Sequence, residues 1–308
     1  MKSFENLQYK RNSWFKSIIR LSGTVIPAVL PRSLACGIFG IGVSMVYQAG
    51  LPVSQPILGS IIPSIVLGLL LVFRTNTAYD RFWEGRKWWG SLITNSRNLA
   101  WQIWVAVEEK DSRDHTRKIA AERLIIAFAI SKKLYLRGEN ALGELDHVVS
   151  PKQYQILQES AHIPLQISLW LGTYLQNEYR NNRLSVNQLM MMQKSVQGLM
   201  ESLGNCERIL KTPIPVAYSV HLNQLILLYC FLLPFQFVAQ LMWLTGPFVA
   251  LISFTLFGIE EIGVEIEQPF GYDANDLPLD EFCDAIENNI ENLIQDNSLD
   301  SFADNLVN

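Results

Sequence analysis

The sequence predicts an all-α integral membrane protein with four transmembrane helices and a large helical cytoplasmic region. Residues 33–73 and 212–259 contain no Asp, Glu, Lys or Arg. Each stretch is about twice as long as the roughly 20 apolar residues that a helix needs to cross a hydrocarbon core of about 30 Å. Each also has turn-forming residues near its centre, at 51–56 and at 245–247. Two membrane hairpins are therefore expected.

Basic residues flank the predicted hairpins on one side only. Arg32 precedes the first crossing, Arg74 follows the second, and Lys211 precedes the third, whereas the short hairpin tips carry no charge. Because basic residues are enriched in cytoplasmic loops, this distribution places both termini and the central region in the cytoplasm.

These signals divide the chain into five segments. Residues 1–31 form an amphipathic juxtamembrane segment, which either lies in the headgroup region or packs on the cytoplasmic part. Residues 32–74 form the first transmembrane hairpin, and residues 75–212 form the cytoplasmic helical region. Residues 213–262 form the second hairpin, and residues 263–308 form a cytoplasmic acidic turn, a helix and a tail.

Helical patterns fill the central region. Helices are expected at 116–136, 151–160 and 164–180, and Ser185 with Gln188 forms a capping box at the start of the next helix. Apolar residues recur along that helix in steps of three and four: Leu189, Met192, Val196, Leu199, Leu203, Cys206 and Leu210. Such a stripe predicts a contact with the core or with another subunit.

Several classes of function are disfavoured. A soluble helical protein is not expected to carry two separate charge-free stretches of double length. The net charge of −4 and the placement of the aromatic residues in helices give no basic face for nucleic acid. The four histidines are isolated, the four cysteines form no CxxC pair, and no catalytic motif is present. An enzyme is therefore not expected, and the residues require no cofactor.

Ile65, Leu69 and Phe73 recur every four residues along the second predicted crossing. They stack along one helix face over about 12 Å. The sequence pattern alone favours a helix-packing stripe. The alternative is a set of apolar rings in a closed assembly of identical subunits, where each ring would be a dewetting constriction on an ion path.

Four motifs stand in a fixed order along the chain, at 73–90, 206–209, 212–215 and 268–280. In sequence and in their placement among four crossings they resemble the bestrophin family, specifically its bacterial branch. The resemblance covers roughly residues 10–295. It implies a ring-shaped homopentamer that conducts ions passively through a pore on the five-fold axis.

The resemblance also implies where the pore is narrow. Its neck, lined by the second membrane helix, falls at Ile65, Leu69 and Phe73. Animal members often carry phenylalanine at the middle ring, so Leu69 is a departure that removes an aromatic edge there. Ungapped counting from the motif at 212–215 places a second, cytoplasmic constriction at Asn187, a polar residue where relatives are usually apolar.

Calcium is the one cofactor that the resemblance suggests. Animal bestrophins hold this ion in an acidic turn after a Pro-Phe-Gly motif, and Asp273 and Asp276 match two of the ligating acids. Two neighbouring acids are absent, and Ca²⁺ takes six to eight oxygens, so backbone carbonyls and water would supply the rest. The alternative is an acidic turn that caps the helix predicted at 279–294.

The resemblance implies a channel for chloride and related small anions, since no ring of acids lies in the membrane stretches. A cation-selective channel of the same architecture is one alternative, because an apolar neck shows no preference for charge. A non-conducting membrane scaffold is another. The expected partners are small inorganic ions, the lipid bilayer and further copies of the chain, but no nucleic acid. The expected location is the cell membrane, either the bacterial inner membrane or an internal membrane such as the thylakoid.

Overall fold

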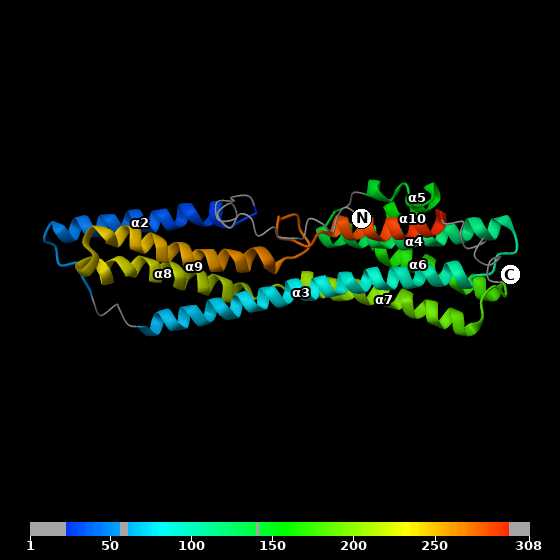
Figure 1. The fold of residues 1–308 in the computed structure, drawn as a ribbon, viewed down its shortest axis with the longest axis horizontal. Helices are drawn as coiled ribbons and strands as arrows, with labels where there is room; N and C mark the ends of the chain where they lie inside the picture. The colour runs from blue at the N-terminus through cyan, green and yellow to red at the C-terminus, as the bar shows by residue number, and fades with distance from the viewer. Residues whose placement is uncertain (1–22, 56–60, 140–141, 296–308) are drawn as a thin grey trace, which may run out of the picture. The chain divides into compact units, whose positions relative to one another are not determined.

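The computed structural model describes residues 23–55, 61–139 and 142–295. Those residues form helices joined by turns, with no strand among them (Figure 1), which confirms the all-α prediction. Most of the predicted juxtamembrane segment and the tail from residue 296 onward lie outside the described residues.

The described chain divides into two compact units. The first, which we call the membrane unit, comprises residues up to 80 together with 214–267 and 273–275. The second, the bundle unit, comprises residues 81–213 and 268–272 and the chain from 276 onward.

The membrane unit contains four long helices. They are α2 (Ile26–Gln48), the first part of α3 (Ile61–Ala106), α8 (Val216–Leu241) and α9 (Thr245–Glu267). A short 3-10 helix, η4 (Met242–Leu244), joins α8 to α9. Figure 1 shows α2, α8 and α9 lying side by side, and the short connection η4 makes α8 and α9 antiparallel neighbours.

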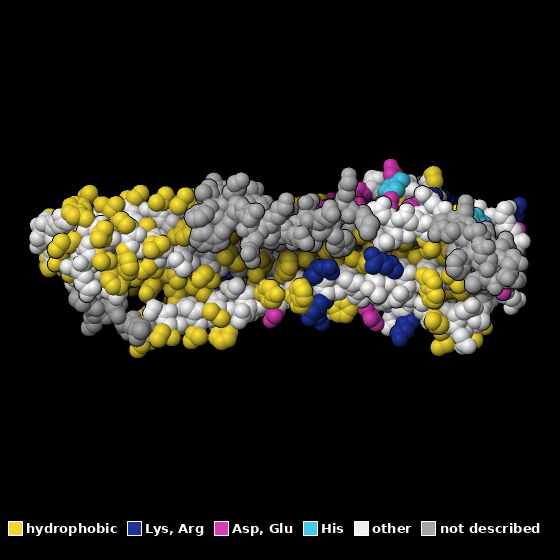
Figure 2. Space-filling model, in the orientation of Figure 1, with side chains coloured by type: hydrophobic (Ala, Val, Ile, Leu, Met, Phe, Trp, Pro, Cys, Tyr) yellow, Lys and Arg dark blue, Asp and Glu magenta, His cyan; other side chains and the backbone are white. Residues whose placement is uncertain are grey.

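Three described stretches are long and apolar enough to cross a membrane, namely 26–48, 62–106 and 216–267. The third stretch reverses direction at η4, so it supplies two crossing helices and the predicted total of four is reached. Hydrophobic side chains cover much of the visible surface of α2, α8 and α9 (Figure 2). An apolar exterior of this kind is typical of a protein surrounded by lipid.

The reversal of the second hairpin lies three residues earlier than its sequence signal. Thr245, Gly246 and Pro247 do not form the turn, because they belong to the first turn of α9. Proline suits this position, since the first N–H groups of a helix have no intrahelical acceptor. The turn-forming residues at 245–247 therefore mark the start of a helix and not the turn itself.

Helices α2 and α9 approach each other closely through small residues. A Cβ atom added to Gly37 would lie 2.8 Å from the Cβ atom of Ala250, and one added to Gly246 would lie 2.9 Å from the carbonyl oxygen of Gly37. Ser44 on α2 also donates a hydrogen bond of 2.9 Å to the carbonyl oxygen of Met242. Lipid is as apolar as the side chains of a membrane helix, so the hydrophobic effect does not drive membrane helices together. They associate through close packing at small residues and through hydrogen bonds between helices.

The bundle unit is built from the second part of α3 and from shorter helices. These are α4 (Ser112–Arg137), η3 (Leu142–Leu145), α5 (Pro151–Glu159), α6 (Ile163–Arg180), α7 (Val186–Lys211) and α10 (Leu279–Gln295). Their bounds agree with the predicted helices to within a few residues. The capping box of Ser185 and Gln188 is present at the start of α7, as predicted.

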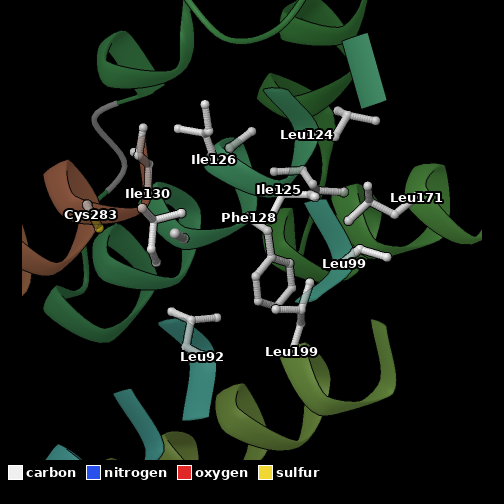
Figure 3. Close-up of a cluster of buried hydrophobic side chains, with 14 of the residues drawn as sticks. Leu92, Leu99, Leu124, Ile125, Ile126, Phe128, Ile130, Leu171, Leu199 and Cys283 are labelled. Carbon is white, nitrogen blue, oxygen red and sulfur yellow. The ribbon is translucent and has the colours of Figure 1, made fainter. Parts of the chain in front are cut away.

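The described residues of the bundle unit share one apolar core. Side chains from α3, α4, α6 and α7 gather around Phe128 (Figure 3). Leu99, Phe128 and Leu199 are fully buried there. The predicted apolar stripe of α7 is part of this core, so the core contact was the correct interpretation of that stripe.

Candidate pore-lining face

One face of α3 in the membrane unit carries large apolar side chains that the rest of the unit leaves uncovered. Ile65 and Leu69 are each 53% exposed, and Phe73 is 62% exposed. Val66 lies on the same exposed surface, and Ile62 extends it toward the start of the helix. The three residues predicted to form the neck therefore share one exposed helix face.

The opposite face of α3 is buried. Leu67 and Leu71 pack against a cluster on α8 that consists of Leu222, Ile226 and Cys230. The hydroxyl of Tyr218 on α8 donates a hydrogen bond of 2.7 Å to the carbonyl oxygen of Leu70. Since an α-helix turns once in 3.6 residues, positions 67 and 71 face away from positions 65, 69 and 73. The packing on α8 thus selects which side of α3 stays exposed.

A buried arginine fixes this rotation at the end of the apolar stretch. Arg74 is only 3% exposed, and it donates a hydrogen bond of 2.6 Å to the Ser219 hydroxyl. Its guanidinium lies 3.4 Å from a Glu267 carboxylate oxygen and 3.9 Å from one of Glu260. The other Glu267 oxygen accepts the backbone N–H of Ile214 at 3.0 Å. A buried charge is tolerated only when it is paired in this way, so Arg74 cannot rotate toward the exposed face at low cost.

Sequence reasoning used Arg74 only as an orientation signal and missed its role as an anchor. The sequence does contain a signal for this role. Arg74 directly follows an apolar run, and Glu260 and Glu267 stand seven residues apart at the end of the last crossing. Two acids at that spacing lie on one helix face, where a single cation can reach both.

The exposed face of α3 becomes polar beyond Phe73. Asn76 and Asp80, three and seven residues further on, are both exposed. Those spacings bring a side chain back to the same side of a helix. Asp80 is the first ionisable residue on this face, and it lies beyond the apolar stretch.

The predicted cytoplasmic constriction lies in the bundle unit. Asn187 is exposed in the first turn of α7, next to the exposed side chain of Val186. Ser185, which precedes them, caps the helix. The cap fixes where α7 starts. The constriction itself remains a prediction about the assembled protein.

The predicted calcium residues lie in the turn between α9 and α10. Asp273 is exposed. Asp276 is partly buried, and a Cβ atom added to Gly271 would lie 2.8 Å from one of its carboxylate oxygens. Among the described residues, no group of three or more His, Cys, Asp or Glu side chains is arranged to hold a metal ion. Calcium binding at Asp273 and Asp276 therefore stays a prediction, in which backbone carbonyls and water would supply the remaining ligands.

Comparison with known proteins supports the interpretation of these motifs. A family model described as bacterial/fungal bestrophin protein matches residues 6–292. The chain is 56% identical over 283 residues to the voltage-dependent anion channel-forming protein alr2987 of Nostoc sp., with 92% of each chain covered. It is 32% identical to the voltage-dependent anion channel-forming protein YneE of Escherichia coli K12, with 89% of each covered.

A solved structure gives the same result for the fold. The crystal structure of a bacterial bestrophin homologue from Klebsiella pneumoniae superposes with a TM-score of 0.78 at 28% sequence identity. The match covers 87% of this chain and 96% of that one. The family model, the relatives and the solved structure all agree with the bestrophin resemblance that the sequence motifs suggested. The chain belongs to the bacterial and fungal bestrophin family.

Proposed function

We propose that the protein is a passive anion channel whose pore is lined by the exposed face of α3. The observation that carries this proposal is the exposure of Ile65, Leu69 and Phe73 on a helix whose other side is held by the buried Arg74. The names of the Nostoc and Escherichia relatives support the anion channel class. The family consists of channels, which agrees with the prediction that the protein is not an enzyme.

One helix cannot enclose a path, so the proposal requires a closed ring of identical chains. We take five chains from the family resemblance. Each copy would then contribute one Ile65, one Leu69 and one Phe73 to three successive apolar rings. Apolar constrictions gate by losing and regaining water, so the three rings together would form a hydrophobic gate.

Chloride and related small anions are the proposed substrates, although the neck itself does not discriminate by charge. A specific observation favours a cation-selective channel as the second candidate. Asp80 is exposed on the same face of α3 as the neck residues. A ring of such carboxylates would raise the local concentration of cations.

Recording from the purified full-length chain in a planar bilayer tests the proposal. With a KCl gradient, we expect the current to reverse near the chloride equilibrium potential. Reversal near the potassium potential would contradict the anion assignment and support the second candidate. If an oligomeric preparation gives no current, with or without calcium, both channel proposals fail and a scaffold role is favoured.

The remaining site residues belong to the same proposal. Asn187 is proposed to form the second constriction, so Asn187→Trp should lower single-channel current, whereas Gln155→Trp at an exposed position of α5 should not. Calcium control is proposed to act through Asp273 and Asp276. Calcium added to chelated protein should change the current of the wild type but not that of Asp273→Ala. A wild type that does not respond to calcium would contradict that role.

A further inference from the structure

The membrane unit contains a groove that the proposed conduction path does not use. A cavity of about 610 Å³ lies between α2, α8 and α9. Its apolar lining includes Cys36, Phe39, Leu227, Phe231 and Phe257. This volume falls within the range typical of small-molecule sites.

A second cavity of about 350 Å³ shares Phe39 with the first and continues along α2 to Val46. Phe235 of α8 lines it from the other side. From Arg32 to Val46 the two cavities follow α2 for about 21 Å at 1.5 Å per residue. One leaflet of the hydrocarbon core is about 15 Å deep, so the combined groove is long enough for one acyl chain.

Charged residues are confined to one end of the groove. Arg32, Asn223 and Glu260 line the first cavity, and the second has no polar side chain in its lining. Arg32 is the last charged residue before the charge-free stretch 33–73, and Glu260 is the first after the stretch 212–259. Both side chains therefore stand where apolar chain meets polar chain, which is the headgroup level of a bilayer.

Glu260 is buried but only weakly paired. Its side chain is 6% exposed, and Arg74 lies 3.9 Å away while making closer contacts with Ser219 and Glu267. Burying a carboxylate is costly unless donors satisfy it. A ligand that brings a hydrogen-bond donor into the cavity would supply what Glu260 lacks.

Arg32 offers the complementary group at the mouth of the same cavity. One of its terminal nitrogens donates to Glu261 at 2.8 Å, and its side chain is 53% exposed. A guanidinium carries five N–H donors, so one such bond leaves donors for a phosphate. The cavity therefore offers a carboxylate acceptor in its interior and a cationic donor at its rim.

We propose that this groove binds a phospholipid whose headgroup carries both a phosphate and a primary ammonium. The phosphate accepts hydrogen bonds from Arg32, the ammonium donates to Glu260, and one acyl chain follows Phe39 and Phe231 toward Val46. A headgroup that is only anionic fits less well, because Glu260 and Glu261 both lie beside Arg32. The proposal does not depend on which ion the channel conducts.

Lipid binding to the purified, delipidated full-length protein tests this proposal. We would titrate phosphatidylethanolamine and phosphatidylglycerol with identical acyl chains and count bound lipid by native mass spectrometry. We expect the wild type to bind phosphatidylethanolamine at least fivefold more tightly. Glu260→Gln should remove that preference, and Phe39→Trp, which fills the groove, should reduce the binding of both lipids.

Matched substitutions outside the groove serve as controls. Asp284→Asn on α10 and Phe248→Trp on α9 should bind lipid like the wild type. Equal affinity of the wild type for the two lipids, or unchanged binding in Phe39→Trp, would overturn the proposal. So would an oligomer that binds neither lipid, which is the result expected if a second copy of the chain fills the groove.

Discussion

The membrane unit and the bundle unit differ in how much apolar surface they bury: the apolar cluster of the bundle unit contains many more buried residues than that of the membrane unit. In the membrane unit, Leu69, Phe73 and Leu251 are each more than half exposed. In the bundle unit, Phe128 and Leu199 are fully buried among other apolar residues. A large contiguous apolar surface is costly in water, so lipid or another copy of the chain is expected to cover it. The exposed face of α3 is therefore explained by the assembled protein in its membrane.

The two units also differ in where they bury charge. The membrane unit buries Arg74 and Glu260 at the end of its apolar stretch, where they face each other. The bundle unit buries charged side chains within its helices, among them Lys132 and Glu122. Lys132 lies 4.7 Å from the centre of the Trp89 ring and 3.2 Å from the Ser202 hydroxyl. Burial lowers the pKa of Lys132, because an apolar environment disfavours the charged ammonium.

The largest effect is expected where the membrane unit has no spare room. In Gly246→Ala the new methyl group would lie 2.9 Å from the carbonyl oxygen of Gly37. We expect a loss of about 3 kcal/mol, at the upper end for overpacking. Gly258→Ala on the same helix is the control, because no atom lies within 4 Å of its added Cβ. Thermal melting in detergent should separate the two variants, and equal melting temperatures would show that α2 and α9 are not packed this closely.

The next effect concerns the buried carboxyl of the bundle unit. Glu122 is fully buried, and within the described part of the chain neither of its oxygens has a hydrogen-bond partner. Burial raises its pKa well above the ordinary value, against a smaller opposing effect of Lys118. Tyr174 of α6 is an ionisable group close enough to interact with Glu122, and it offers no cation.

The sign of the resulting pH dependence follows from proton binding. Above about pH 4.5 the unfolded chain has lost the Glu122 proton and the folded chain keeps it, so stability falls by up to about 1.4 kcal/mol per pH unit until the folded-state pKa is passed. We expect Glu122→Gln to lose this slope between pH 5 and the folded-state pKa. Glu201→Gln, an exposed site on α7, should keep it. The free energy of unfolding would be measured by denaturation of the wild type and both variants across this pH range. A wild type whose free energy of unfolding shows no such slope would contradict the raised pKa of Glu122.

A polar substitution in the neck tests what the exposed face does. Leu69→Asn should wet the middle apolar ring and raise the current about tenfold, equivalent to about 1.4 kcal/mol of barrier. Leu251→Asn, on an exposed position of α9, should leave the current unchanged. Single-channel recording compares them. Equal currents in Leu69→Asn and the wild type would mean that this face packs against another helix.

The smallest effect is expected at Asp80. In Asp80→Asn, the loss of a carboxylate beside the path should raise anion conductance about twofold at low ionic strength and much less at 1 M salt, where the Debye length is about 3 Å. Asp284→Asn on α10 provides the charge-matched control. The same increase at both salt concentrations would indicate a change of shape and would remove Asp80 from the electrostatics of the pore.

Local features of the fold could be predicted from the sequence because they depend on neighbouring residues. The capping box at Ser185, the helices of the bundle unit and the charge-free crossings all arise from short-range patterns. The hairpin turn before α9 was misplaced because Pro247 suits both a turn and a helix start.

The candidate site could be predicted only in part. The spacing of Ile65, Leu69 and Phe73 put them on one face, but Leu67 and Leu71 are equally apolar, so composition could not say which face would be exposed. That choice depends on contacts of Arg74 with Ser219 and Glu267, which are far away in the sequence. The groove that ends at Glu260 could not be predicted either, because its lining comes from three helices that only the fold brings together.

Cysteine accessibility tests whether the exposed face of α3 lines the conduction path. Leu69→Cys would be recorded in a planar bilayer before and after a charged methanethiosulfonate reagent, with the wild type, which has four native cysteines, and Leu251→Cys as controls. We predict that the reagent blocks or strongly reduces current through Leu69→Cys and changes neither control. If the current through Leu69→Cys persists unchanged after mass spectrometry has verified the modification, this face of α3 does not line the path.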